Sequence, residues 1–595
     1  MTREPAAAAA AASADNARIA WRRGVFAALA GLTILGLLWL MVVALSAGGF
    51  GIVDGIILAL FAAMLPWTVV GFWNAAIGFF VMRLGVEGDG TQTADDKEIT
   101  VSTAILVCIR NESPERVIRN VKPLVDGLIA AGSTDRFCLY VLSDSDAPDL
   151  IRVEASRFDT FATALRGQFS VHYRRREANT GYKAGNIRDF CERWGDKHDL
   201  AVVLDADSFM TAAAVLRLVR RMQTHPNIGI LQSLVVGLPS ASAFARIFQF
   251  GMRLGMRSYT AGSAWWQADC GPYWGHNAVI RLAPFMAHCR LSTLPGNGPL
   301  AGHVLSHDQV EATLMRRAGY EVRVLTREDQ SWEDNPPTLS EFIRRDLRWC
   351  QGNMQYLHFL ALPGLKPVSR SQLVLALLMF LASPAWIGLL VLGSLAAAFT
   401  DTPVVRPEAG LAVFALVVTM WFAPKIASVL DVLRQPYMRR AFGGPLRFTA
   451  GVAAETVFFI LLSPIMWFEH TVCLLRLLCG RTSGWSAQLR DDHSVPFFVA
   501  CRHLWPQTVV GAGSIALLAF TQPAAIPYTL FVSAGLAVSI PFAVITAMPG
   551  VGRALARWGL GRLPEETDPP PELHALALPA FETGAQPPQP QPRAA

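Results

Sequence analysis

The sequence predicts an α/β domain with a mostly parallel central sheet, inserted between transmembrane α-helices. The 595-residue chain is 52% hydrophobic and only 16% charged, whereas charged residues make up about 25% of an average soluble domain. This shortage of charge is uneven, because long stretches carry none while residues 84–370 have the composition of a soluble domain. Over residues 100–345 short apolar runs alternate with helical stretches, which is typical of a parallel sheet covered by helices. The uncharged stretches must be helical, since a chain in lipid has to satisfy its own backbone hydrogen bonds.

The distribution of charge divides the chain into five parts. They are a disordered tail (1–20), a transmembrane hairpin (21–83), the cytoplasmic α/β domain (84–370), a second transmembrane region (371–550) with a cytoplasmic loop at about 476–503, and a cytoplasmic, largely disordered tail rich in Pro and Gln (551–595). The nine cysteines include no Cys-x-x-Cys pair, so neither a disulfide framework nor a zinc site is expected. We attribute the net charge of +6 to arginines at membrane ends and expect no nucleic-acid partner.

The orientation in the membrane follows from the basic residues around the first hairpin. Its apolar segments, 24–48 and 53–82, are each long enough to cross a bilayer, which takes about 20 residues. Arginines flank the hairpin at its outer ends, at positions Arg18, Arg22, Arg23 and Arg83. The positive-inside rule therefore places the N-terminus and the α/β domain in the cytoplasm.

The second membrane region leaves the number of crossings open. Two apolar hairpins are expected, at about 372–398 with 410–430 and at about 505–522 with 527–548. Residues 450–475 lie between them with arginines on both sides, so charge disfavours a single crossing. This segment either lies in the interface or forms a short hairpin that breaks at Ser463-Pro464. The total is six or eight crossings, or seven if the charge rule fails.

Three apolar runs, 103–109, 137–144 and 200–207, predict buried parallel strands that end in polar residues. In an open α/β sheet, ligands bind beyond the carboxyl ends of the strands. The side chains expected to converge on one crevice there are Arg110, Asn111, Asp144, Asp146, Asp205 and Asp207.

Asp205 and Asp207 are the candidate metal ligands. Two carboxylates separated by one residue on an extended strand point the same way, and they repel each other unless a cation lies between them. Mg²⁺ or Mn²⁺ would accept both carboxylates together with phosphate oxygens. The alternative is a turn with two solvated aspartates, and an Asp-x-Asp string alone does not decide between the two.

Three further motifs each allow a catalytic and a structural interpretation. Asp144 or Asp146 would accept hydrogen bonds from a base or ribose, or would form an Asx-turn before the next helix. Lys183 opens a helix, where its ammonium group suits a diphosphate or simply lies on the surface. Asp308 also stands at a helix start and is either a general base for an acceptor hydroxyl or an N-cap.

Arg345, Arg348 and Trp349 come just before the chain returns to the membrane. The two arginines are about one helical turn apart and share a face, so they can clamp a pyrophosphate leaving group. Trp349 offers a flat apolar face on which a sugar ring can stack. The alternative is an Arg/Trp belt at the membrane boundary.

The order of these motifs resembles the processive family 2 glycosyltransferases, such as cellulose, chitin and hyaluronan synthases. Their pattern of D, DxD, TED and QxxRW stands here as Asp144/Asp146, Asp205/Asp207, Ser306-His307-Asp308 and Arg345-x-x-Arg348-Trp349. "SHD" in place of "TED" and Arg345 in place of Gln argue against cellulose synthase itself. They are similar to the glucans biosynthesis glucosyltransferase H branch, which builds osmoregulated periplasmic glucans. So are the strings "NTGYKAGNIRDF" (179–190), "DCGPYWGHNAVIR" (269–281) and "RDDHSV" (490–495), and the resemblance covers about residues 20–560.

The resemblance implies a GT-A-type nucleotide-sugar domain and a role for each motif. Asp144 and Asp146 would contact the uridine, and Lys183 the diphosphate. Asp205 and Asp207 would hold the UDP and Mg²⁺ or Mn²⁺, and Asp308 would be the base. Arg345 and Arg348 would steady the leaving UDP, and the acceptor site would include Trp349, Cys270, Gly271 and Asn277. Residues 484–495 would sit where related synthases carry a loop that closes over the donor.

The implied reaction is an inverting transfer of glucose from UDP-glucose to a growing glucan at the inner membrane, coupled to export through the bilayer. The resemblance adds periplasmic glucan-processing proteins and acyl carrier protein as partners. Two other functions stay open. Transfer of one sugar to a polyprenyl phosphate does not need Arg-x-x-Arg-Trp, and a transporter with a regulatory nucleotide-binding domain predicts charges at the membrane midplane. The candidates for such charges are Lys425, Glu455 and Glu469.

Overall fold

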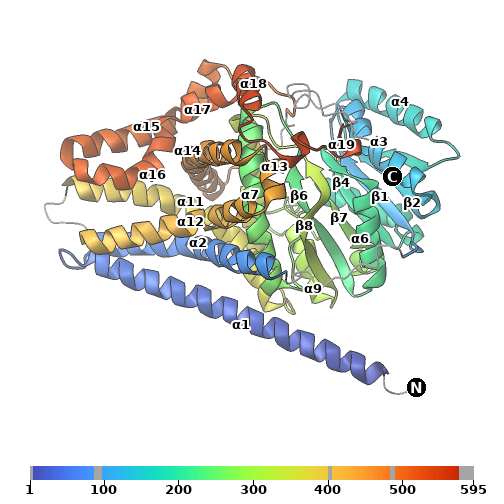
Figure 1. Ribbon diagram of the computed structural model, residues 1–595, viewed down its shortest axis with the longest axis horizontal. Coiled ribbons are helices and arrows are strands. Elements are labelled where there is room, and N and C mark those ends of the chain that lie inside the picture. Colours follow the sequence, from blue (N-terminus) through green and yellow to red (C-terminus); the bar gives the residue numbers. More distant parts are fainter. Residues whose placement is uncertain (1–3, 86–96, 400–404, 483–488, 575, 577–595) are drawn as a thin grey trace.

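The computed structural model describes residues 4–85, 97–399, 405–482, 489–574 and 576. An α/β domain lies at one end of the molecule, and a bundle of long helices lies at the other (Figure 1). The helices of the bundle come from both ends of the sequence, so the α/β domain is an insertion between them, as predicted.

The strands of the α/β domain form one sheet. They are β1 (Thr103–Ile109), β2 (Phe137–Ser143), β3 (Ser170–Arg175), β4 (Leu200–Asp205), β5 (Ser208–Met210), β6 (Ile228–Gly237), β7 (Ala278–Arg281) and β8 (Glu321–Glu333). The helices of this part are α3 (Pro114–Ala130), α4 (Pro148–Ala164), α5 (Tyr182–Trp194), α6 (Ala212–Thr224), α7 (Ala243–Gln267), α8 (Leu282–His288), α9 (Asp308–Arg317) and α10 (Leu339–Met354).

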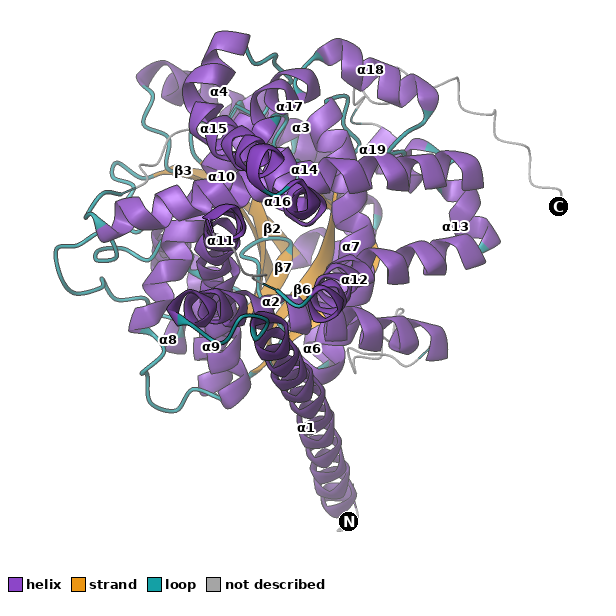
Figure 2. Cartoon of the chain, turned by 90° about the vertical axis from the view of Figure 1, so that its left-hand side faces the viewer, coloured by secondary structure: helices purple, strands orange, loops and turns teal. Residues whose placement is uncertain are grey.

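The remaining helices precede or follow this domain. They are α1 (Glu4–Leu45), α2 (Ile52–Leu84), α11 (Pro367–Phe399), α12 (Pro407–Arg434), α13 (Pro436–Ala441), α14 (Pro445–Leu478), α15 (Phe497–Thr521), α16 (Ile526–Ala537), α17 (Ser539–Thr546), α18 (Pro549–Trp558) and α19 (Pro571–His574). Seen from the end of the bundle that lies on the left of Figure 1, α2, α11 and α12 are viewed nearly along their axes with the sheet behind them (Figure 2).

The sheet has the order β3-β2-β1-β4-β7-β6-β8-β5 and is mostly parallel, as predicted. Strands β1 to β4 pair in parallel, as do β6 and β8, whereas β7 and β5 run antiparallel to their neighbours. Helices cover both faces: Leu106 of β1 packs in the cluster that contains Phe190 of α5, and Ile105 packs in the cluster that contains Leu124 of α3. A parallel strand buried on both faces has to be apolar at every position, which explains the continuous apolar runs.

The register of the central strands sets up the site. In β1, Cys108 pairs with Asp205 of β4, and Ile109 pairs with Ser143 of β2. The three strands therefore end level with one another, and the polar residues that follow them leave the sheet at one edge.

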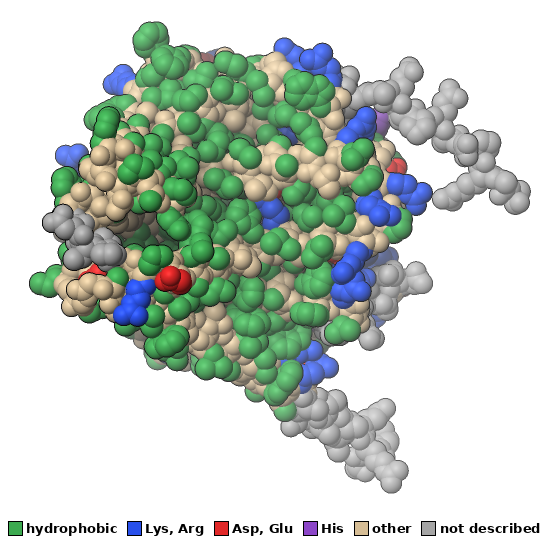
Figure 3. All heavy atoms as spheres, turned by 60° about the vertical axis from the view of Figure 1, so that its left-hand side comes forward, with side chains coloured by type: hydrophobic (Ala, Val, Ile, Leu, Met, Phe, Trp, Pro, Cys, Tyr) green, Lys and Arg blue, Asp and Glu red, His purple; other side chains and the backbone are tan. Residues whose placement is uncertain are grey.

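Six helices are long and apolar enough to cross a membrane within the described residues: α1 (from Asp15), α2, α11, α12, α14 and α15. The bent pair of Pro523–Ala537 and Ser539–Thr546, which meet at 54°, would be a seventh. Hydrophobic side chains cover most of the surface on the helical side, and Lys and Arg gather towards its border (Figure 3). The chain is therefore a membrane protein.

Helix α14 answers the question left open for residues 450–475. It runs without a break through Pro464, so the alternative of a hairpin at Ser463-Pro464 is wrong. Its first turns pack on α7, with the rings of Phe448 and Phe250 6.0 Å apart. Its last turns pack on α10, where His470 Nε2 and Asp346 Oδ2 are 2.5 Å apart.

Because both ends of α14 contact the α/β domain, the helix lies along the border between the domain and the bundle. Figure 1 shows α14 almost end-on, while α1, α2, α11 and α12 run across the page. This arrangement agrees with the interfacial alternative, and it leaves five of the long helices and the bent pair, six in all among the described residues, as the candidate crossings.

The described parts of both tails are more ordered than predicted. Helix α1 begins at Glu4, so residues 4–20 are helical where a disordered tail was expected; the run of alanines there has the highest intrinsic helix propensity. Residues 551–574, expected to be largely disordered, contain the rest of α18 together with α19, and Leu573 is fully buried.

Helices α2 and α7 cross so closely that only glycine fits at the contact. A Cβ atom on Gly262 of α7 would lie 1.8 Å from the carbonyl oxygen of Asn74 in α2. We expect Gly262→Ala to destabilise the protein by about 1–3 kcal/mol, because α7 has to move away from α2. Thermal unfolding in detergent measures this. The control is Gly255→Ala on the same helix, where a Cβ meets nothing within 4 Å; equal effects at both positions would contradict the expectation.

Candidate active site

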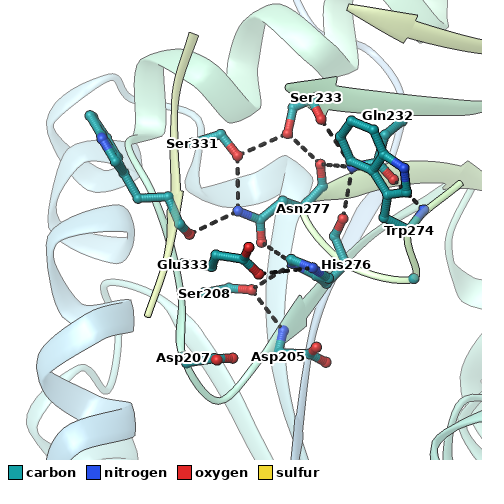
Figure 4. A network of polar contacts seen from close by, with 12 residues as sticks. Asp205, Asp207, Ser208, Gln232, Ser233, Trp274, His276, Asn277, Ser331 and Glu333 are labelled. Atoms are coloured by element: carbon teal, nitrogen blue, oxygen red, sulfur yellow. Dashed lines mark hydrogen bonds and ion pairs between the residues drawn. The ribbon is translucent and has the colours of Figure 1, made fainter. Parts of the chain in front are cut away.

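Asp205 and Asp207 lie at the predicted edge of the sheet, but each carboxylate is bound by its own protein cation. Strand β4 ends at Asp205, whose backbone N–H donates to Ser208 Oγ at 3.0 Å (Figure 4). Lys183 Nζ contacts the Asp205 carboxylate, and Arg490 contacts that of Asp207. Burial alone would raise the pKa of Asp205, but the charges of Lys183 and His276 lower it overall. Among the described residues each carboxylate thus has its own protein cation, and a divalent cation shared by the two stays a prediction.

Lys183 reaches into this crevice from α5. The helix begins at Tyr182, after Gly181 in the left-handed region (φ 73°). Besides Asp205, Lys183 Nζ donates to the backbone oxygen of Gly275 at 2.7 Å. The alternative of a surface lysine is wrong, because the ammonium group is enclosed by two acceptors of the site.

Asp308 borders the same crevice as Lys183, but it comes from helix α9. It is the first residue of α9, and the N-cap position belongs to His307, so Asp308 is not an N-cap. A Cβ built on Gly275 would lie 3.3 Å from the Cβ of Asp308. Since the Gly275 carbonyl accepts from Lys183, the candidate base, the lysine and Asp205 border one crevice.

Of the two aspartates after β2, only Asp146 is exposed. Asp144 is bound bidentately by Arg176, with N–O distances of 2.7 Å at both oxygens, and its side chain is 5% exposed. The carboxylate therefore fixes Arg176, which also donates to the backbone oxygen of Thr180 just before α5. This differs from the expected contact with uridine. Asp146 is 61% exposed and accepts from Arg110 and Asn111, so the polar residues after β1 and β2 do meet.

Arg345 and Arg348 of α10 place two positive charges close together at this site. The Arg345 guanidinium stacks on Trp349, 4.8 Å from the ring centroid, and Trp349 is 46% exposed. Burial and the charges of Arg490 and Arg345 lower the pKa of Arg348 to about 10. Guanidinium groups crowded in this way favour an anion between them, and a diphosphate would satisfy that need.

The residues expected to floor an acceptor pocket are buried instead. The Asn277 side chain is fully buried and donates to Ser331 Oγ (2.8 Å) and to the Trp332 carbonyl (3.0 Å). Cys270 is 1% exposed, and Gly271 donates its N–H to the Val322 carbonyl at 2.7 Å. All three hold the loop before β7 against β8. The prediction that these side chains line an open pocket therefore finds no support here, whereas Trp349 stays a candidate.

Sequence reasoning missed three charged residues of this site. His276 Nε2 and Glu333 Oε2 are 3.3 Å apart beside Ser208 (Figure 4), and burial raises the pKa of Glu333. Arg176 was also missed. His276 lies within the string "GHN", but a lone histidine carries no spacing pattern that would single it out. Arg490 belongs to the segment expected to close over the donor, of which residues 484–488 lie outside the described part.

A buried ion pair stands directly behind Asp308. His307 Nδ1 and Glu311 Oε2 are 2.9 Å apart, and both side chains are less than 10% exposed. Burial would lower the pKa of His307, but the Glu311 carboxylate raises it overall. The stabilisation is therefore complete below the unfolded-state pKa of about 6.5 and is lost as pH rises through the higher folded-state value.

We expect the thermal midpoint of the protein in detergent to fall, in part through this pair, over the pH range that begins at about 6.5. In His307→Gln this component disappears, so the midpoint changes less with pH over the same range. A control variant is His288→Gln, at the exposed end of α8. Identical pH dependence in wild type and His307→Gln would show that the pair does not titrate there.

Comparison with known proteins identifies relatives over nearly the whole chain. Models of glycosyl transferase family 2 and of glycosyl transferase family group 2 match residues 104–288 and 200–426. A glucans biosynthesis glucosyltransferase H from Xanthomonas campestris pv. campestris is 33% identical over 556 residues, covering 90% of this chain and 86% of that protein. Proteins of the same name from Ralstonia nicotianae (36%) and Pseudomonas paraeruginosa (35%) cover 90% and 87% of this chain.

The chain spans 64% and 62% of the length of the Ralstonia and Pseudomonas relatives, respectively. Among solved structures, a mannosyltransferase from Pyrobaculum calidifontis in complex with GDP-Man and Mn²⁺ is similar with a TM-score of 0.43 and 15% identity. That similarity covers 64% of this chain and 99% of the mannosyltransferase.

Proposed function

The chain belongs to the glucans biosynthesis glucosyltransferase H family, and on that premise we propose that it transfers glucose from UDP-glucose to a growing glucan. The observation that carries this proposal is the position of Lys183. Its ammonium group bridges Asp205 and the carbonyl of Gly275, against which Asp308 packs. A donor diphosphate held near Lys183 would therefore have its sugar close to a carboxylate able to act as base.

The proposed reaction is a single in-line displacement. Asp308 takes the proton from an acceptor hydroxyl, the acceptor oxygen forms the new bond to the anomeric carbon, and the bond from that carbon to the diphosphate oxygen breaks. The electron pair leaves with UDP, and the configuration inverts. Arg345 and Arg348 stabilise the negative charge on the leaving diphosphate, and Trp349 presents its exposed ring to the acceptor.

Asp205 and Asp207 fit a divalent cation, Mg²⁺ or Mn²⁺, because both carboxylates are held by cations at the edge of the sheet. When bound, the cation would neutralise charge on the diphosphate. The described residues contain no cluster of three acidic, histidine or cysteine ligands. Phosphate oxygens and water would have to complete the coordination, which is the usual situation for Mg²⁺.

We propose that the α/β domain lies on the cytoplasmic side of the inner membrane, as the flanking arginines predict. The glucan would leave past Trp349 and the border helices α10 and α14 into the helix bundle. Periplasmic glucan-processing proteins and acyl carrier protein stay predictions from the family resemblance.

The test is incubation of the purified protein in lipid nanodiscs with labelled UDP-glucose and Mg²⁺ or Mn²⁺, followed by linkage analysis of the product. UDP-galactose and GDP-mannose serve as donor controls. A glucose polymer made only from UDP-glucose supports the proposal. One sugar on a polyprenyl phosphate would replace it with the lipid-linked alternative. In sealed vesicles, glucan found only on the UDP-glucose side would contradict export.

A further inference from the structure

The chain returns to the catalytic sheet after its last apolar helices. Residues 559–576, called the C-terminal strap below, follow α18 and are described except for residue 575. Figure 1 shows this red part of the chain, with α19, reaching the strands. A tail of this composition, rich in Pro and Glu, was expected to be largely disordered, so its ordered contacts require an explanation.

The end of the strap packs against strand β5, which follows the Asp-x-Asp turn, and against its neighbour β8. Leu573 and Leu576 are buried in one cluster with Phe209 and Trp332. Phe209 of β5 is paired with Trp332 of β8 in the register of the sheet. Strand β5 is the outermost strand and begins one residue after Asp207. The strap therefore supports an edge strand whose position fixes Asp207.

The buried carboxylate of Glu565 joins the strap to strand β8 and to helix α7. Glu565 Oε2 is 2.5 Å from Arg253 Nη1, and Glu565 Oε1 accepts from Trp332 Nε1 at 3.1 Å. The Arg253 side chain is 5% exposed and also pairs with Glu328 of β8. Next to it, Glu566 Oε2 lies 2.8 Å from Arg246 Nη1 in α7. Because water does not solvate a carboxylate buried in this way, its position depends on its ion-pair and hydrogen-bond partners.

The start of the strap is bound to the border helices. Leu563 is fully buried in a cluster with Phe250, Phe442 and Phe448. Thr567 Oγ1 donates to the Ala441 carbonyl of α13 at 2.7 Å. One short segment thus links α13 and α14, at the membrane border, to α7 and to the strands β5 and β8 of the active site.

We propose that the C-terminal strap positions the Asp-x-Asp turn, and that Glu565 is its positioning residue. Glu565 holds Trp332, Trp332 holds Phe209 and β5, and β5 sets where Asp207 and Ser208 stand. Ser208 in turn accepts from the backbone of Asp205. The consequence for catalysis rests on the proposed function, whereas the consequence for cation and nucleotide binding at the turn does not.

The experiment compares full-length wild type with Glu565→Gln and with a chain ended after residue 562. We expect the Kd for Mn²⁺ with UDP, measured by electron paramagnetic resonance, to rise about tenfold in the truncated chain and about threefold in Glu565→Gln. With labelled UDP-glucose, we expect KM to rise by similar factors and kcat to change less. A merely structural role would lower the amount of folded protein without changing KM.

Two controls match these variants. A chain ended after residue 576 removes only residues outside the described part, and Glu572→Gln makes the same charge change at a strap residue with no ion pair among the described residues. Both should bind Mn²⁺ and UDP within about twofold of wild type. If the truncated chain does not fold, Glu565→Gln decides alone, and unchanged Mn²⁺ and UDP affinity in it overturns the proposal. Weakened binding in a protein that makes no glucan would support the strap and contradict the proposed function.

Discussion

Asp308→Asn is expected to lower glucose incorporation by about 10²–10⁴-fold, the usual effect of losing a general base. The amide has the same shape as the carboxylate, so it keeps the close packing against Gly275, where an added Cβ would lie 3.3 Å from the Asp308 Cβ. It does not accept the acceptor proton at neutral pH. Turnover falls for that reason, while the affinity for UDP, measured calorimetrically, stays within about twofold.

The matched control for Asp308→Asn is Asp149→Asn, which makes the same change in the first turn of α4 on an exposed side chain. Its turnover should equal that of wild type. If Asp308→Asn retained more than a tenth of wild-type turnover, the base would have to be another group, and Glu333 beside His276 is the next carboxylate of the crevice. Loss of UDP affinity in Asp308→Asn would instead indicate a structural role.

The parts of the site that follow from local pattern could be predicted. Three apolar runs had to be parallel strands, and level strand ends brought Arg110, Asp146 and Asp205 to one edge. Lys183 and Asp308 stand at helix starts, because the sequence around each changes there from loop residues to a helical pattern. Each of these expectations depends on a few neighbouring residues and on the geometry of a sheet.

The parts that depend on distant partners could not be predicted. Arg490 and Asp207 are 283 positions apart, and nothing in either string indicates the other. Asp144 lies at the strand end where a ligand contact was expected, but Arg176 donates hydrogen bonds to both of its carboxylate oxygens. Apolar length alone would have counted α14 as a crossing, and only its contacts with α7 and α10 place it at the border. The strap was missed for the same reason, since its composition is that of a disordered tail.

The contact between Arg490 and Asp207 leads to the second large effect. Arg490 lies where a divalent cation would have to bind Asp207, so guanidinium and cation compete for one carboxylate. At an effective dielectric constant of 20, two opposite unit charges about 4 Å apart attract each other by about 4 kcal/mol. When the guanidinium moves away from Asp207, its new contacts replace only part of that attraction. We therefore expect a cation that binds Oδ2 of Asp207 to displace Arg490, which would then be available to the donor diphosphate.

We expect Arg490→Gln to bind Mn²⁺ at least about tenfold more tightly than wild type when no UDP is present, because the competitor for Asp207 is gone. Asp207→Asn should lose Mn²⁺ binding and more than about 10²-fold of glucose incorporation, since one of two carboxylate ligands is missing. Electron paramagnetic resonance of Mn²⁺ measures both. Asp491→Asn changes the neighbouring residue, whose partner Arg116 lies on α3, and should leave Mn²⁺ affinity as in wild type. Equal Mn²⁺ affinity in wild type and Arg490→Gln would mean that the guanidinium and the cation do not share Asp207, and the assignment of this carboxylate to the cation would then be wrong.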